Sequence, residues 1–79
     1  MQRWNKLLFE QTVESQCKMY GVDSVNAQHY GGRWISVMVW LDQYSDTVDF
    51  EMMSETETPW TEANARKAVG LGRAVVRNR

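Results

Sequence analysis

The sequence predicts a single two-layer α+β domain with the element order αβββα, spanning residues 1–79. Three observations lead to this fold class. Apolar residues recur at helical spacing near the start, an apolar run bounded by turn residues fills the middle, and an alanine-rich segment with helix-start signals follows. Three strands joined by short turns form an antiparallel meander, and we expect N- and C-terminal helices to cover one of its faces.

The first expected element is a helix over about residues 5–20. One face of it collects residues at helical spacing, namely Phe9, Val13, Cys17 and Tyr20. Asn5 is a good N-cap, and Gly21 stands where a left-handed glycine ends many helices. A strand over residues 4–9 is the alternative for the start of this segment.

Three strands are expected next, separated by turn residues. The candidate strands are residues 25–30, 33–41 and 47–53. Gly31-Gly32 supplies the positive φ angles of a tight hairpin. The polar residues 42–46 supply the second turn.

The length of the second turn decides which residues of the second and third strands face each other. A four-residue loop over 43–46 places Leu41 opposite Val48 and Val39 opposite Phe50. Cross-strand neighbours share one face of a sheet, so this register builds a continuous apolar surface. The odd-numbered residues of the central strand are therefore expected in the core.

The first hairpin leaves two registers open. A two-residue Gly31-Gly32 turn puts Ala27 on the face of Trp34, whereas a three-residue loop with a glycine bulge puts Ala27 opposite Ile35. A slip of one residue turns every side chain to the other face, so the two registers exclude each other. The bulged loop agrees with the second hairpin and is the preferred prediction.

The last expected element is a helix that begins near Pro59, with Thr58 as its N-cap. Its buried face is expected to hold Ala65, Ala68, Leu71, Gly72 and Val75. Gly70 and Gly72 each cost a helix about 1 kcal/mol relative to Ala. The helix either stops near Val69 or continues because glycine permits a close approach to the sheet, and we expect it to continue.

The net charge of −1 hides an uneven distribution of charge along the chain. Residues 34–65 contain no Lys or Arg, but they contain Asp42, Asp46, Asp49, Glu51, Glu55, Glu57 and Glu62. The residues that follow carry cations without an acid, namely Arg66, Lys67, Arg73, Arg77 and Arg79. Such a split bears on partners more than on fold. The total charge argues against a dedicated nucleic-acid binder, which is usually clearly basic.

The face of the central strand that points away from the core is the first candidate site. It carries Trp34, Met38 and Trp40, and the expected register places Trp40 opposite Asp49 and Met38 opposite Glu51. Exposed apolar patches mark partner sites, and Trp, Tyr and Met are enriched in interface cores. The alternatives are that a helix or a terminus covers this face, or that two copies pack through it as a homodimer.

The acidic run adds a preference for a partner with a basic or apolar surface. The ordinary explanation of such a run is a solvated face and turn. The candidate partner-binding residues are Tyr30, Trp34, Met38, Trp40, Asp42, Asp46, Asp49 and Glu51.

A second candidate site consists of arginines that contact nucleic-acid phosphates, namely Arg66, Arg73, Arg77 and Arg79. The three within the expected helix share the face opposite its buried residues. The competing explanation is a solvated helix face with cations well placed near the helix C-terminus. Nucleic acid is therefore the less favoured partner.

Enzyme chemistry finds little support in the sequence. His29 is the only histidine and Cys17 the only cysteine, and Cys17 is expected on a buried helix face. The aspartates do not match an EF-hand loop, and phosphate-loop, dinucleotide and zinc motifs are lacking. We expect no catalytic residues, metal or cofactor. The single cysteine and the lack of a long apolar run fit a cytoplasmic protein without a membrane segment.

The αβββα order resembles the double-stranded RNA-binding domain in topology only. That family carries a basic cluster at the start of its second helix, where this chain reads TPWTEANARK with only Arg66 and Lys67 basic. No site residue is transferred from the family. The preferred hypothesis is a non-enzymatic protein-binding module. Its most concrete form is a small phage-type inhibitor that occludes a host nucleic-acid-processing or defence protein, such as an anti-CRISPR or anti-restriction factor.

Overall fold

The computed structural model describes residues 3–42, 44–52 and 58–78, and it confirms the α+β class and the αβββα order. The elements are α1 (Lys6–Cys17), the short 3₁₀ helix η1 (Lys18–Tyr20), β1 (Val22–His29), β2 (Trp34–Leu41), β3 (Tyr44–Glu51) and α2 (Glu62–Arg77). The three strands form one antiparallel sheet in the order β1-β2-β3.

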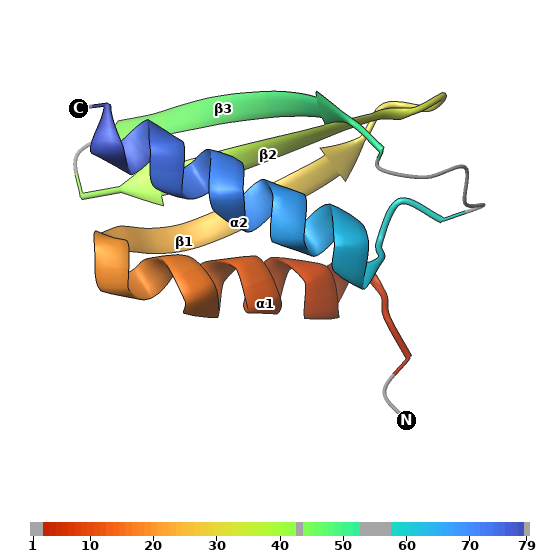
Figure 1. Cartoon of the computed structure of the whole chain (residues 1–79), viewed down its shortest axis with the longest axis horizontal. Coiled ribbons are helices and arrows are strands. Elements are labelled where there is room, and N and C mark those ends of the chain that lie inside the picture. The colour runs from red at the N-terminus through yellow and green to blue at the C-terminus, as the bar shows by residue number, and fades with distance from the viewer. Residues whose placement is uncertain (1–2, 43, 53–57, 79) are drawn as a thin grey trace.

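Both helices lie on the same side of the sheet (Figure 1). Helix α1 runs along β1, and α2 crosses the sheet beside α1. The core between the two layers collects Phe9, Val13, Cys17, Val22, Val25, Ala27, Ile35, Val37, Val39, Leu41, Phe50, Met52, Ala65 and Ala68. Neither helix covers the other face of the sheet, so the described residues leave that face open.

Helix α1 begins as Asn5 predicts, but it ends at Cys17, and Gly21 ends the 3₁₀ helix that follows it. The Asn5 side chain accepts a hydrogen bond of 2.8 Å from the Leu8 amide. Gly21 adopts a φ of 99° after η1. The expectation for Tyr20 was wrong, because the tighter turn of η1 takes this side chain off the buried face and leaves it 38% exposed.

The first hairpin joins β1 and β2 through Gly31, Gly32 and Arg33. Both glycines have positive φ, and the Tyr30 amide donates to the Trp34 carbonyl oxygen at 3.4 Å. The loop has three residues, as expected, but it starts one residue later than predicted.

The register of β1 against β2 is therefore displaced by two residues from the predicted one. His29 lies opposite Ile35, and Ala27 lies opposite Val37. A displacement of two keeps every side chain on its predicted face, because strand side chains alternate with a period of two. Ala27 is accordingly buried.

Strand β1 begins at Val22, three residues before the predicted Val25, and it contains a bulge between Val22 and Ser24. The extra residue, Asp23, breaks the alternation of side chains. Val22 therefore reaches the same buried face as Val25 although the two are an odd number of positions apart. Sequence periodicity alone assigns these residues to opposite faces, which is why the start of the strand was missed.

The second hairpin is tighter than predicted, which corrects the start of the third strand. Leu41 lies opposite Tyr44, so β3 begins three residues before the predicted Thr47. Ile35 faces Phe50 and Val37 faces Val48. The displacement is again even, and the odd-numbered residues of β2 stay in the core as predicted.

Helix α2 does not begin at Pro59, as the sequence suggested. Its N-cap is Thr61, whose hydroxyl oxygen accepts from the Asn64 amide at 3.2 Å. The preceding residues are held in another way: the buried Asn64 side chain donates to the Pro59 carbonyl oxygen at 2.9 Å. The Trp60 ring packs edge-on against Phe9 at 5.1 Å. These contacts use residues 59–60 to close the end of the core rather than to start the helix.

Helix α2 continues through both glycines, as predicted, and the two glycines differ in their surroundings. A Cβ at Gly72 would lie 3.4 Å from Cys17 Sγ and 3.7 Å from a Val39 methyl group. Gly72 therefore allows α2 to approach α1 and the sheet closely. A Cβ at Gly70 would meet nothing within 4 Å, so packing gives no reason for that glycine.

Candidate functional site

The open face of the sheet carries a central row of large side chains on β2, which we call the tryptophan row. Trp34 is 55% exposed, Trp40 is 45% exposed, and Met38 is half-buried between them. Ser36 is the buried member of the same row. The row combines two large half-exposed indoles with a flexible thioether on a face that neither helix covers.

Polar residues of the two outer strands flank the tryptophan row. On β1 these are Ser24, Asn26 and Gln28, and on β3 they are Ser45, Thr47, Asp49 and Glu51. The predicted cross-strand pairs were wrong: Trp40 lies opposite Ser45, and Met38 lies opposite Thr47. The tighter second hairpin moves the carboxylates along the sheet, so that Glu51 lies opposite Trp34 and Asp49 lies opposite Ser36.

The structure brings together only part of the predicted partner-binding set. Asp49 and Glu51 share the open face with the tryptophan row, and Glu51 pairs with Arg33 at 2.9 Å. Asp46 lies opposite Val39 on the helix-bearing side, where it is exposed. Tyr30 and Asp42 are exposed at the two opposite hairpin ends of β2. The site is thus a row with acidic residues along one side, not a single patch of eight residues.

The two edges of the sheet differ in where their side-chain acceptors come from, which the sequence did not predict. A side chain of α1 reaches the β1 edge, whereas the acceptor at the β3 edge belongs to β3 itself. At the β1 edge, Glu10 of α1 accepts a hydrogen bond of 2.7 Å from the Ala27 amide. At the β3 edge, Asp46 Oδ1 accepts from the Thr47 amide at 3.0 Å. Glu10 and Ala27 are 17 positions apart, so no local sequence pattern indicated this contact.

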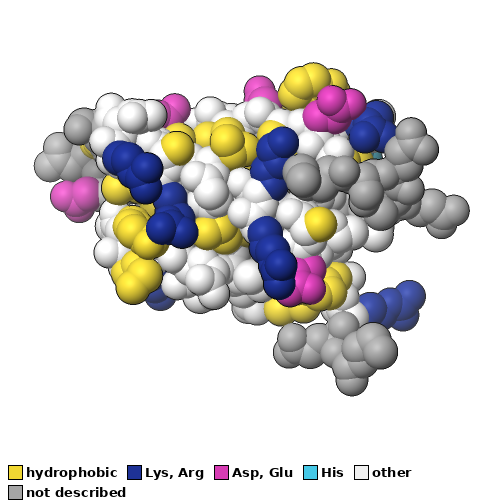
Figure 2. All heavy atoms as spheres, viewed as in Figure 1, with side chains coloured by type: hydrophobic (Ala, Val, Ile, Leu, Met, Phe, Trp, Pro, Cys, Tyr) yellow, Lys and Arg dark blue, Asp and Glu magenta, His cyan; other side chains and the backbone are white. Residues whose placement is uncertain are grey.

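The helix-bearing side of the molecule carries the cations. Arg66, Lys67, Arg73 and Arg77 are exposed along α2, and Figure 2 shows Lys and Arg side chains spread over this side. Arg66 pairs with Glu62 at 3.0 Å, and the Arg73 guanidinium lies 4.6 Å from the centre of the Tyr20 ring. The predicted arginine stripe is thus on one exposed helix face, except that Arg79 lies outside the described residues.

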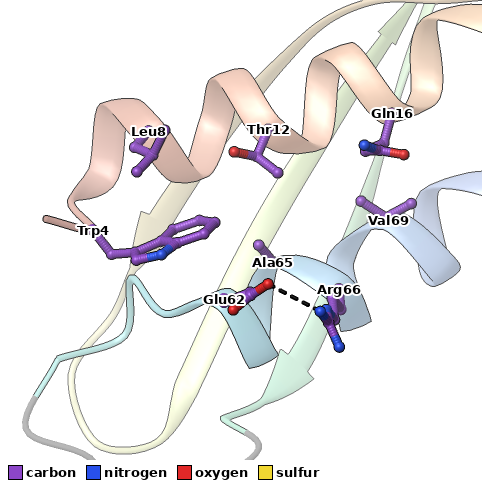
Figure 3. A pocket seen from close by; sticks show the side chains of 8 residues that line it. All are labelled: Trp4, Leu8, Thr12, Gln16, Glu62, Ala65, Arg66 and Val69. Atoms are coloured by element: carbon purple, nitrogen blue, oxygen red, sulfur yellow. Dashed lines mark hydrogen bonds and ion pairs between the residues drawn. The ribbon is translucent and has the colours of Figure 1, made fainter. Parts of the chain in front are cut away.

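A groove of about 380 Å³ lies between α1 and α2 on this same side. Trp4, Leu8, Thr12 and Gln16 form one wall, and Glu62, Ala65, Arg66 and Val69 form the other (Figure 3). The Glu62–Arg66 ion pair stands on the α2 wall. Arg66 therefore belongs both to the groove and to the row of cations.

The candidate catalytic residues do not form a site. The Cys17 side chain is buried, and burial raises its pKa while the nearby Arg73 opposes the rise. A protonated, buried thiol is a poor nucleophile. The exposed His29 ring lies 3.2 Å from the Gly32 carbonyl oxygen at the hairpin. Among the described residues, His, Cys, Asp and Glu side chains form no group that could hold a metal ion.

No helix in the described part of the chain has the length and apolar character needed to cross a membrane. Comparison of the chain with protein-family models, with curated proteins and with solved structures finds no significant match.

Proposed function

We propose that the protein is a non-enzymatic protein-binding module that docks a partner on the open face of its sheet. The observation that carries the proposal is the half-exposure of Trp34 and Trp40 on a face that neither helix covers. These indoles remain in contact with water in the folded protein, whereas the side chains on the other face of the same strand are buried in the core. A partner that buries them gains the apolar contact that the fold leaves unused.

The composition of the row supports protein docking rather than catalysis. Trp is the residue type most typical of binding hot spots, and Met adapts its shape to irregular surfaces. The flanking hydroxyl and amide side chains of β1 and β3 supply a polar rim. A dry centre within a polar rim is the usual anatomy of a protein interface.

The charges beside the row favour a basic partner. Asp49 and Glu51 are the acids on the open face; Glu51 already pairs with Arg33 at 2.9 Å, and the strands themselves carry no lysine or arginine. A module with this surface acts by occlusion when it occupies a basic groove, such as the phosphate-binding groove of a nucleic-acid-processing or defence protein. Attraction of this kind speeds association and weakens as the salt concentration rises.

Quantitative affinity capture from cells of the source organism tests the proposal. The wild-type protein is compared with a Trp34→Ser/Trp40→Ser variant and with a matched Arg66→Ala/Lys67→Ala variant on the helix side. We expect the tryptophan variant to lose a specific partner, because one hot-spot side chain is worth at least about 2 kcal/mol, or roughly thirtyfold in affinity. The helix-side control keeps the partner.

Circular dichroism and thermal unfolding establish that the variants are folded, which the exposure of all four side chains leads us to expect. Equal recovery of the partner by the wild type and by the folded tryptophan variant contradicts the proposal. Loss of the partner in the Arg66→Ala/Lys67→Ala control instead moves the binding site to α2.

A second candidate function, binding of a nucleic-acid backbone along α2, is favoured by Gly70. This glycine is exposed in mid-helix between Arg66 and Arg73, and no neighbouring atom in the described structure needs its small size. It costs the helix about 1 kcal/mol relative to Ala. A glycine lets a phosphate backbone approach the helix closely, with arginines on either side to contact it.

An electrophoretic shift assay at low salt, with duplex DNA, duplex RNA and single strands, tests this second function. The Gly70→Leu variant is expected to weaken binding without unfolding, and Arg73→Ala/Arg77→Ala to reduce its salt dependence. Absence of a shift at low salt, or a shift that survives all three substitutions, contradicts it.

A further inference from the structure

We propose that the β3 edge of the sheet accepts a basic, extended segment of the partner as a fourth strand. The inference rests on the proposed function, because it specifies how a partner on the open face continues around its side. The strand that fits this edge belongs to another protein and alternates Lys or Arg with apolar or small residues.

The β1 edge is closed to such a strand. The Glu10 carboxylate occupies the Ala27 amide, a donor that points away from β2. Helix α1 also packs along β1, so an incoming strand would meet the helix. An inward-reaching charged side chain and a covering helix are two known ways in which proteins block an edge strand.

The backbone of β3 presents outward groups at every second residue. The Met52 amide donates to the Arg33 carbonyl oxygen, which makes Arg33 and Met52 a hydrogen-bonded pair. Hydrogen-bonded and non-hydrogen-bonded pairs alternate along an antiparallel ladder. The amides that point away from β2 are therefore those of Ser45, Thr47, Asp49 and Glu51.

Among the described residues, one of these four outward amides has an acceptor, which is Asp46 Oδ1 on Thr47. The residues with outward amides are also those whose side chains lie on the open face. A strand paired with them extends the same face that carries the tryptophan row. The edge and the row therefore form one continuous docking surface.

Charge decides which strand fits. Asp46 and Asp49 are exposed along β3 together with Glu51, which is paired with Arg33, and β3 itself has no basic residue. Opposite charges on directly paired strands stabilise a sheet, whereas like charges destabilise it. A second copy of this chain, paired β3 to β3, would bring two acidic strands together, so a basic strand of a different protein is the occupant that the edge favours.

Nuclear magnetic resonance with a ¹⁵N-labelled full chain tests the inference. The probe is a synthetic peptide of alternating Lys and Val, with blocked termini. The first matched control peptide has Pro in place of its central Val, which keeps the charge but removes a backbone donor. The second replaces every Lys with Glu. Exchange of the outward β3 amides is compared with that of the Val48 and Phe50 amides, which point towards β2.

We expect the Lys-Val peptide to slow exchange at Asp49 and Glu51 by about tenfold when nine-tenths of the protein is bound. The Pro-containing and Glu-containing peptides should leave these rates unchanged. An Asp49→Lys/Glu51→Lys variant should lose the effect, whereas Asp23→Lys, a reversal on β1, should keep it.

The indole N–H signals of Trp34 and Trp40 separate the two proposals. Shifted indole signals with unchanged β3 exchange overturn strand addition and leave docking on the open face standing. Equal slowing by the Pro-containing peptide shows charge attraction without strand pairing and overturns the inference. Protection of the outward amides in the free protein that grows with its concentration shows that a second copy is the occupant, which also overturns it.

Discussion

Gly72 of α2 lies against Cys17 of α1, so closely that a Cβ at position 72 would stand 3.4 Å from the sulfur. The same Cβ would lie 3.7 Å from a methyl group of Val39 in the sheet below. A Cβ at this position would already be in van der Waals contact with its neighbours, so a side chain that extends beyond Cβ would overpack the space between the helices and the sheet.

The paired glycines of α2 give a matched stability test. Gly72→Leu should destabilise the protein by about 1–3 kcal/mol, because it overpacks the contact with Cys17. Gly70→Leu points into open space and should stabilise the fold by roughly the 1 kcal/mol that a glycine costs a helix. Urea unfolding of the two variants measures the difference. Equal effects at the two positions would contradict the packing.

The buried Cys17 thiol predicts a loss of stability at alkaline pH. Burial raises its pKa in the folded protein, so above the unfolded thiol pKa of about 8.5 the unfolded chain binds fewer protons than the folded one. The contribution of Cys17 to the free energy of unfolding is fully present below that pH. It is lost as the pH rises through the pKa of the thiol in the folded protein. Unfolding free energies of the wild type and Cys17→Ala, compared at neutral and alkaline pH, should converge with rising pH. A constant difference is the contrary outcome.

The Glu10–Ala27 hydrogen bond predicts that removing the carboxylate lowers the stability of the fold. Glu10→Ala leaves the Ala27 amide without its acceptor and should destabilise the fold by about 1–3 kcal/mol. Glu10→Gln keeps an acceptor oxygen and should cost less. Amide exchange at Ala27 should accelerate in Glu10→Ala, and unchanged exchange there would show that the bond does not protect this edge.

The hydrogen bond of Asn64 predicts how the stability of an Asn64→Asp variant depends on pH. Its buried amide donates to the Pro59 carbonyl oxygen at 2.9 Å, and an aspartate cannot donate there when ionised. Asn64→Asp should therefore destabilise the protein at neutral pH and recover part of the loss in acid, where the carboxyl group is protonated. Thermal unfolding at the two pH values measures this, and a pH-independent loss would argue against the contact.

The sequence predicts the sheet faces better than the strand registers, for a physical reason. The first hairpin register was displaced by two residues and the second by four, and an even displacement preserves which side chains face the core. Apolar alternation indicates which face a side chain lies on, whereas turn geometry sets the register. Leu41 could pair with Tyr44 or with Val48 without moving an apolar residue of β2 to the other face. For this reason the sequence placed Asp49 opposite Trp40, whereas it lies opposite Ser36 in the structure.

Local capping rules located α1 well but placed the start of α2 too early. Thr58 and Thr61 are both competent N-caps, and Pro59 suits a first helical position. The choice between them depends on Asn64 and on the packing of Trp60 against Phe9, which are tertiary contacts. The bulge at Asp23 and the contact of Glu10 likewise depend on residues distant in sequence, so no local sequence pattern predicts them.

Site-specific photo-crosslinking shows whether a partner protein docks on the open face of the sheet. A photoreactive phenylalanine analogue is placed at Trp40 on the open face or at Leu7, a 62%-exposed residue of α1, and cells of the source organism are irradiated. The proposed docking predicts a discrete protein adduct from position 40 and none from position 7. Adducts from position 7 alone, or none from position 40 while the protein is bound to a partner, would contradict it.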